Sequence, residues 1–62
     1  MTAEFILRFL LNHEVRFRTA GNAELTGEVG ILGNGKVGIL TTSESFSSSE
    51  VKKVRRIVVR AG

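Results

Sequence analysis

Residues 25–40 read LTGEVGILGNGKVGIL, and this stretch decides the fold because it contains the strongest hairpin signal in the chain. Its Asn34-Gly35 pair is flanked by residues that favour strands, an arrangement typical of a two-residue type I′ turn. Both central positions of that turn need a positive φ, which Asn tolerates and Gly adopts freely. The sequence therefore predicts a β-hairpin with Asn34-Gly35 at its tip.

This tip fixes the register of the predicted hairpin. It places Leu32 opposite Val37 and Val29 opposite Leu40. Apolar side chains then occupy both faces of the hairpin. One face carries Leu32, Val37 and Ile39, and the other carries Val29, Ile31 and Leu40.

Three glycines interrupt the strands of this hairpin, at Gly27, Gly30 and Gly38. In the predicted register, Gly30 and Gly38 each lie opposite an isoleucine. Because glycine weakens a flat strand, we interpret these positions as bends where the sheet curls on itself. A strongly bent hairpin that is apolar on both faces predicts the centre of a small barrel.

The length and composition of the chain limit the fold and its chemistry. The 62 residues make a single domain, 1–62, which buries only about 60% of its unfolded surface. The chain has no Cys and one His, His13, so we expect no disulfide, no metal site and no cofactor. A Cys-free chain fits a reducing, cytoplasmic setting. A core this small supplies about 3–5 kcal/mol, so we expect a homo-oligomer.

The charge of the chain points to an anionic partner. Nine Lys and Arg stand against six Asp and Glu, and the sequence pI is about 10.2. Basic small domains of this kind commonly bind nucleic acid, either RNA or DNA. The alternative is that the charges only keep an apolar small protein in solution.

The apolar N-terminal segment is expected to form a helix over residues 3–12. Thr2 is a candidate N-cap, and Glu4 in the first turn suits the helix dipole. Alternation of apolar residues also permits a strand, but the Leu-rich composition favours a helix. His13 follows the helix, where its imidazole faces the negative end of the dipole.

This helix is too apolar to be covered by its own small domain. It is also far too short to span a bilayer, and it lacks the features of a signal peptide. We therefore expect it to contact the sheet, a second subunit or another protein partner. The residues predicted for this interface are Phe5, Ile6, Phe9 and Leu10.

The rest of the chain is expected to be β-structure. The predicted strands are 14–20, 23–32, 36–42, 43–48 and 54–60, with a one-turn helix over 49–53. The hydroxyl-rich segment 41–49 also fits a low-complexity linker, but Phe46 in its middle favours a strand with one buried anchor. The predicted fold is mainly β, a strongly bent five-stranded antiparallel barrel with a short N-terminal helix.

Two motifs carry a family resemblance. Gly27-x-Val29, a hairpin tip and Val37-x-Ile39-Leu40 follow the first signature of the Sm/Lsm/Hfq family, and SEVKKV followed by RRIVV resembles its turn and closing strand. The resemblance implies an Sm-like small barrel that is RNA-associated or regulatory. The sequence departs from the family where Gly33 and Val37 replace the Asp and Asn of the RNA-facing loop. Lys52-Lys53 also lack the neighbouring His of Hfq. The resemblance therefore does not imply the family's uridine pocket.

Catalysis is not expected. The glutamates are scattered along the chain, and the predicted topology brings no pair of them together with a base. The glycine-rich segment 30–35 superficially resembles a phosphate-binding loop. Such a loop leads into a helix, whereas this one leads into a strand.

Basic side chains of the first and last strands form the predicted nucleic-acid site. In a small barrel of this order these two strands are commonly neighbours, so their outward arginines merge into one patch. The predicted binding residues are Arg16, Arg18, Lys52, Lys53, Arg56 and Arg60. They are expected to bind phosphates without reading sequence, since no exposed aromatic is evident to stack a base. The alternative function is a protein-interaction adaptor that uses the apolar helix and the open strand edges.

Overall fold

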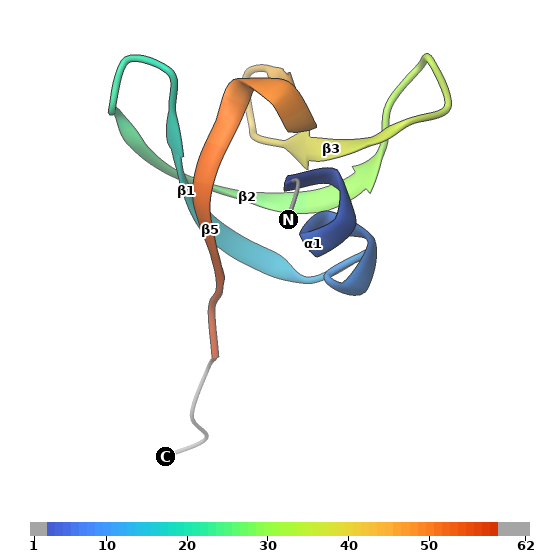
Figure 1. The fold of residues 1–62 in the computed structure, drawn as a ribbon, viewed down its shortest axis with the longest axis horizontal. Helices are drawn as coiled ribbons and strands as arrows, with labels where there is room; N and C mark the ends of the chain where they lie inside the picture. Colours follow the sequence, from blue (N-terminus) through green and yellow to red (C-terminus); the bar gives the residue numbers. More distant parts are fainter. Residues whose placement is uncertain (1–2, 59–62) are drawn as a thin grey trace.

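The structure of the protein is a computed structural model, and residues 3–58 are described. A short helix is followed by five strands and one 3₁₀ turn (Figure 1). The elements are α1 (Ala3–Phe9), β1 (Glu14–Thr19), β2 (Glu24–Ile31), β3 (Val37–Leu40), β4 (Ser45–Ser47), η1 (Ser48–Glu50) and β5 (Val51–Arg56). The prediction of a mainly β fold with a short N-terminal helix is confirmed.

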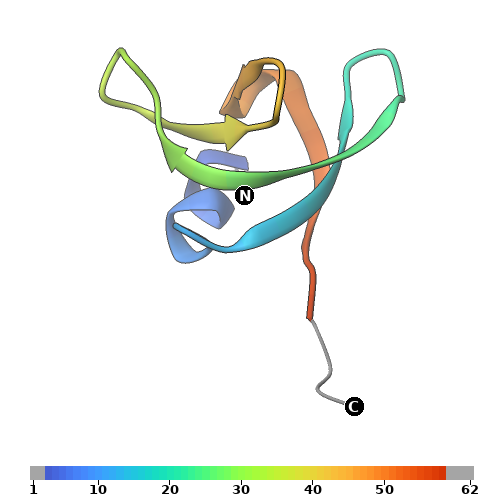
Figure 2. The same cartoon turned by 180° about the vertical axis from the view of Figure 1, so that it is seen from behind.

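The five strands form one antiparallel sheet in the order β4-β3-β2-β1-β5. The sheet curls around α1, which lies on its concave side and contacts β3, β5 and η1 (Figures 1 and 2). The sheet does not close, because β4 and β5 are its two edges and are joined through η1 instead of pairing. The term barrel therefore describes the curl of the sheet but not a closed ring of strands.

The core lies between α1 and the concave face of the sheet. Phe17 on β1 and Leu7 on α1 are its largest buried side chains, and Phe17 makes an edge-to-face contact with Phe46 at 5.4 Å between ring centroids. The buried residues are Leu7, Val15, Phe17, Val29, Val37, Ile39 and Val51. The N-terminal helix therefore completes the core of its own domain with one face.

The central hairpin lies where the sequence predicted it, but its loop has three residues and not two. Leu32 N donates to Lys36 O at 2.8 Å, and Gly35 N donates to Leu32 O at 2.9 Å. Gly35 has a φ of 80°, whereas Asn34 does not have a positive φ. This arrangement is a tight turn that ends in a left-handed glycine, and the predicted type I′ turn is wrong.

The longer loop shifts the hairpin register by one residue. Val29 lies opposite Ile39 and Ile31 opposite Val37. A shift of one residue moves every side chain to the other face, so the predicted face assignments are wrong. Gly30 lies opposite Gly38, and neither faces an isoleucine.

Two of the three glycines allow the strands to approach closely. A Cβ on Gly27 would lie 2.7 Å from both Ile39 Cγ2 and Leu40 O, and one on Gly38 would collide with the Phe46 carbonyl oxygen. No side chain fits at either position without moving the backbone of the next strand. These contacts support the interpretation of Gly27 and Gly38 as points where the sheet curls.

The remaining differences from the prediction lie at the ends of elements. The helix ends at Phe9 and not at 12, and Asn12, with a φ of 68°, takes the left-handed conformation common after a helix. Thr2, the candidate N-cap, lies outside the described residues. At the other end of the chain, η1 occupies Ser48–Glu50, so β5 begins at Val51, three residues before its predicted start.

Candidate anion-binding site

A β-bulge in β5 determines the site. β5 pairs with β1 both before and after Phe17. Opposite Phe17 itself, β5 has two residues, Lys53 and Val54. Lys53 has a φ of 54°, in the left-handed region that residues with a side chain seldom adopt. The bulge therefore breaks the alternation of side chains along β5.

The bulge decides which basic side chains share a face. Before it, Lys52 lies opposite Arg18, and after it Arg55 lies opposite Arg16. Residues directly opposite one another in an antiparallel pair project from the same face. All four therefore lie on the outer face, the side of the sheet away from the core. Arg55 was not among the predicted binding residues.

The placement of Arg56 on this face was wrong. It lies opposite Val15, which is buried on the core side of the sheet. The prediction assigned Arg56 to the outer face from the alternation of residues 54–60 alone, whereas the pairing with β1 after the bulge places Arg55 on the outer face and Arg56 on the core side. Arg56 is nevertheless exposed and lines a second hollow of about 240 Å³ beside Arg16 and Arg55.

The basic residues surround a shallow outer groove between β1 and β5, with a volume of about 390 Å³. It is lined by Arg16, Phe17, Arg18, Glu24, Lys53, Val54 and Arg55. The ring of Phe17 lies in the core, with only 1% of the residue exposed. The groove is therefore a cationic surface with four positive side chains and a single carboxylate among its described lining residues.

Two cross-strand pairs in this region bring like charges together. Arg16 lies opposite Arg55, and Arg18 lies opposite Lys52. Like charges directly opposite each other destabilise a sheet, because nothing within the pair offsets their repulsion. An anion bound between the strands would remove this repulsion.

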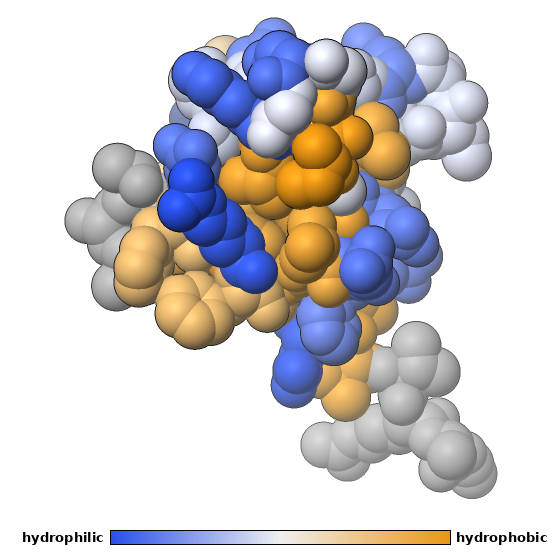
Figure 3. All heavy atoms as spheres, turned by 90° about the vertical axis from the view of Figure 1, so that its right-hand side faces the viewer, coloured by the Kyte–Doolittle hydropathy of each residue, from blue (hydrophilic) through white to orange (hydrophobic). Residues whose placement is uncertain are grey.

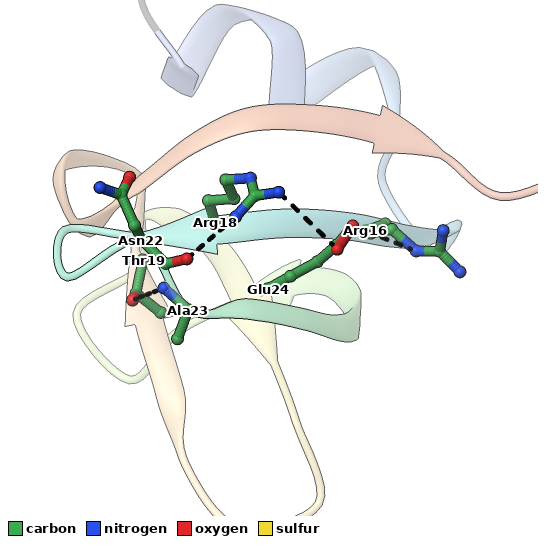
Figure 4. Close-up of polar contacts among 6 residues, drawn as sticks. All are labelled: Arg16, Arg18, Thr19, Asn22, Ala23 and Glu24. Carbon is green, nitrogen blue, oxygen red and sulfur yellow. Dashed lines mark hydrogen bonds and ion pairs between the residues drawn. The ribbon is translucent and has the colours of Figure 1, made fainter.

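Glu24 is the carboxylate of the outer groove, and it lies between two guanidinium groups (Figure 4). Its Oε1 is 3.8 Å from Arg16 Nε, and its Oε2 is 3.9 Å from Arg18 Nη2. Arg18 Nη1 also donates a hydrogen bond of 3.0 Å to Asn22 O in the β1–β2 turn. This bond holds the Arg18 guanidinium over the groove.

Four of the six predicted binding residues are thus gathered on the outer face. Arg16, Arg18 and Lys53 line the groove, and Lys52 lies directly beside it, opposite Arg18. Arg56 lies in the adjoining hollow, and Arg60 lies outside the described residues.

The predicted interface residues divide into two groups. Phe5 and Phe9 are exposed, with ring centroids 5.1 Å apart, whereas Ile6 and Leu10 are half-buried. Leu11 and Ile31 are also exposed and line a common hollow. Figure 3 shows apolar side chains gathered between polar ones on the side that is at the right in Figure 1. The expectation that no aromatic is exposed is therefore wrong, because Phe9 is 73% exposed.

Comparison with family models, with curated proteins and with solved structures gave no match for this chain. Within residues 3–58, no helix is long and apolar enough to cross a membrane. The same residues contain no group of three or more His, Cys, Asp or Glu placed to hold a metal ion. The site is therefore interpreted from its own geometry and charge.

Proposed function

We propose that this protein is a non-catalytic nucleic-acid-binding domain that holds the phosphate backbone of RNA or DNA in the outer groove. The observation that carries the proposal is the pair of like-charged cross-strand contacts, Arg16 with Arg55 and Arg18 with Lys52. A ligand that binds only the folded state stabilises it, and phosphates would also relieve the repulsion between these side chains.

The groove suits phosphate contacts better than base contacts. Guanidinium groups bind phosphate oxygens with two parallel hydrogen bonds, and such contacts fix the position of the nucleic acid without reading its sequence. The only aromatic residue that lines the groove, Phe17, turns its ring into the core. Binding with little sequence preference is therefore expected.

A salt titration with duplex DNA and with a short RNA tests this proposal. Arg16→Gln and Arg55→Gln should each weaken binding for all sequences and reduce the slope of log K against log salt by about one unit on duplex DNA. Arg8→Gln is the matched control, because Arg8 is an exposed arginine on α1 that pairs with Glu4 away from the groove. Absence of binding at about 50 mM salt would overturn the proposal.

A second candidate function is an adaptor or self-associating module. The exposed side chains of Phe9, Leu11 and Ile31 favour it, because small monomers seldom leave several large apolar residues near one another. Light scattering tests self-association, and Phe9→Ala should abolish it without affecting nucleic-acid binding. A mass equal to that of the monomer at all concentrations would contradict self-association.

Two further expectations belong to the proposal. The order of one short helix and five antiparallel strands is what the Sm-like resemblance implies, and membership in that family stays a prediction. A cytoplasmic location is likewise proposed from the absence of cysteine.

A further inference from the structure

We infer that Glu24 is an internal competitor for the anion site, with its carboxylate held where a phosphate group of the ligand would bind. This inference rests on the proposed function. It adds a residue that sets which anions the groove accepts, since a ligand must displace the carboxylate to reach both arginines.

The position of Glu24 follows from the sheet register. Glu24 lies opposite Arg18 in the β1–β2 pair, so both side chains project from the outer face. From there its two oxygens approach a different guanidinium each, Oε1 toward Arg16 and Oε2 toward Arg18 (Figure 4). A phosphate group bridging the same two arginines would occupy this place.

The contacts of Glu24 are loose enough to be exchanged. Both ion pairs, at 3.8 and 3.9 Å, are longer than the 2.7–3.2 Å of a protein hydrogen bond, and the side chains of all three residues are at least 40% exposed. The carboxylate therefore offsets charge without engaging the guanidinium N–H groups closely. A phosphate oxygen that comes within hydrogen-bond distance makes the stronger contact.

This arrangement favours a chain of phosphates over a single anion. An isolated phosphate gains the Arg16 and Arg18 contacts but has to displace Glu24 to do so. A nucleic-acid backbone also reaches Arg55 and Lys52 on the other strand, so its further contacts offset the loss of the carboxylate. Glu24 thus makes the groove selective for polyanions.

The experiment compares Glu24→Gln with Glu28→Gln in titrations with duplex DNA and with inorganic phosphate. Glu28 is the matched control because it lies on the same strand and the same outer face, opposite Glu14, and forms no ion pair with Arg16 or Arg18. At about 50 mM salt, Glu24→Gln should raise the affinity for DNA about two- to fivefold, and Glu28→Gln should raise it less. Glu24→Gln should also produce the larger relative gain for inorganic phosphate.

Two more variants show whether Glu24 acts through the arginines. In an Arg16→Gln/Arg18→Gln background, the gain from Glu24→Gln should disappear, as expected for coupled residues. Glu24→Asp withdraws the carboxylate by one methylene and should give a smaller gain in the same direction. Thermal unfolding of each variant establishes that the protein is folded in the titration.

The outcomes separate this inference from the proposed function. Equal effects of Glu24→Gln and Glu28→Gln, or a loss of affinity in Glu24→Gln, would overturn the role of Glu24. The proposed function would still stand if the arginine variants weakened binding. If neither DNA nor RNA bound to any variant, both the inference and the proposed function would fail.

Discussion

Strand β1 has a different neighbour on each side, and its two sides differ in regularity and in charge. On the β2 side, five residue pairs follow one another without interruption, and Arg18 lies opposite Glu24. On the β5 side the pairing is broken by a bulge, and Arg18 lies opposite Lys52. The positive charge of β1 is thus partly neutralised on the β2 side, whereas on the β5 side it lies opposite another positive charge. The candidate site lies on the irregular side, where basic side chains of the two strands lie opposite one another.

The two sides also differ in what sets their register. β2 follows β1 through a short turn in which Asn22 N donates to Thr19 O at 2.9 Å and Asn22 has a φ of 69°. β5 arrives from far along the chain, and its register depends on which of its side chains enter the core. Val51 and Val54 both pack there, although they are three residues apart. A strand of period two accommodates that spacing only with an extra residue, which is the bulge.

The largest expected effect is at Phe17, which joins the two sides because it lies opposite Leu25 on β2 and opposite the bulge on β5. Phe17→Ala should cost about 3–5 kcal/mol, since it removes the largest buried side chain. That is comparable with the whole stability of a core this small, so the cooperative thermal transition should be lost. Phe9→Ala on the exposed face of α1 is the control and should retain it.

Breaking the close approach of β2, the regular neighbour of β1, to β3 should have the next largest effect. Gly27 lies opposite Val15 in the β1–β2 pair, and a methyl group there meets Leu40 O at 2.7 Å. Gly27→Ala should therefore destabilise the protein by about 1–3 kcal/mol, measured by urea unfolding. Gly33→Ala is the control, because no atom beyond Gly33 and its two chain neighbours lies within 4 Å of its added Cβ. Equal unfolding midpoints for the two variants would contradict the close approach at Gly27.

Changing the bulge itself should alter the stability by a smaller amount and in the opposite direction. A left-handed conformation costs about 1–2 kcal/mol for a residue with a side chain, whereas glycine in a strand costs about 0.5–1 kcal/mol through its chain entropy. Lys53→Gly should therefore stabilise the protein by about 0.5–1 kcal/mol. Lys53→Gln separates the loss of charge from the relief of strain. Lys52→Gly, at an ordinary strand position, should destabilise instead.

The regular side of the sheet could be predicted from sequence. Strands predicted at 14–20 and 23–32 are observed at Glu14–Thr19 and Glu24–Ile31, because alternation and a local turn together fix both strands. The central hairpin was located correctly but shifted by one residue. Its Asn34-Gly35 signal fits a three-residue loop ending in a left-handed glycine as well as a two-residue turn.

The irregular side was predictable only in part. Arg16 and Arg18 were placed correctly because they alternate with buried residues along an unbroken strand. Arg56 was assigned to the outer face in place of Arg55, since alternation within the last strand does not by itself say which of its two faces packs on the core, and the pairing with β1 decides this. The Ser47-x-x-Glu50 capping box was a signal that the strand starts at 51. In a strand that starts at Val51, the two inward valines, Val51 and Val54, are three residues apart, and this spacing indicates a bulge.

The smallest expected effect on stability concerns the turn that leads into β5, one of the two neighbours of β1, and this effect depends on pH. The turn before β5 is held by Glu50, whose Oε1 accepts hydrogen bonds from Ser47 N at 2.8 Å and from Ser47 Oγ at 2.9 Å. These bonds, first the backbone one and then the hydroxyl one, lower the pKa of Glu50 below its ordinary value of 4.5. The turn before β2 is held by hydrogen bonds among Thr19, Asn22 and Ala23 and by the Arg18 guanidinium, which donates to Asn22 O; none of these bonds uses a carboxylate.

The pKa of Glu50 is lower in the folded state than in the unfolded state. Its contribution to the free energy of unfolding is therefore complete above the unfolded-state pKa and is lost as the pH falls through the folded-state pKa. Glu50→Gln should therefore be less stable than the wild type at pH 7, and the difference should shrink as the pH falls below 4.5. Urea unfolding at pH 7 and at about pH 3 measures both differences. The control is Glu44→Gln, whose carboxylate accepts no hydrogen bond from residues 3–58. A difference between wild type and Glu50→Gln that stayed constant with pH would show that the carboxylate charge does not position β5.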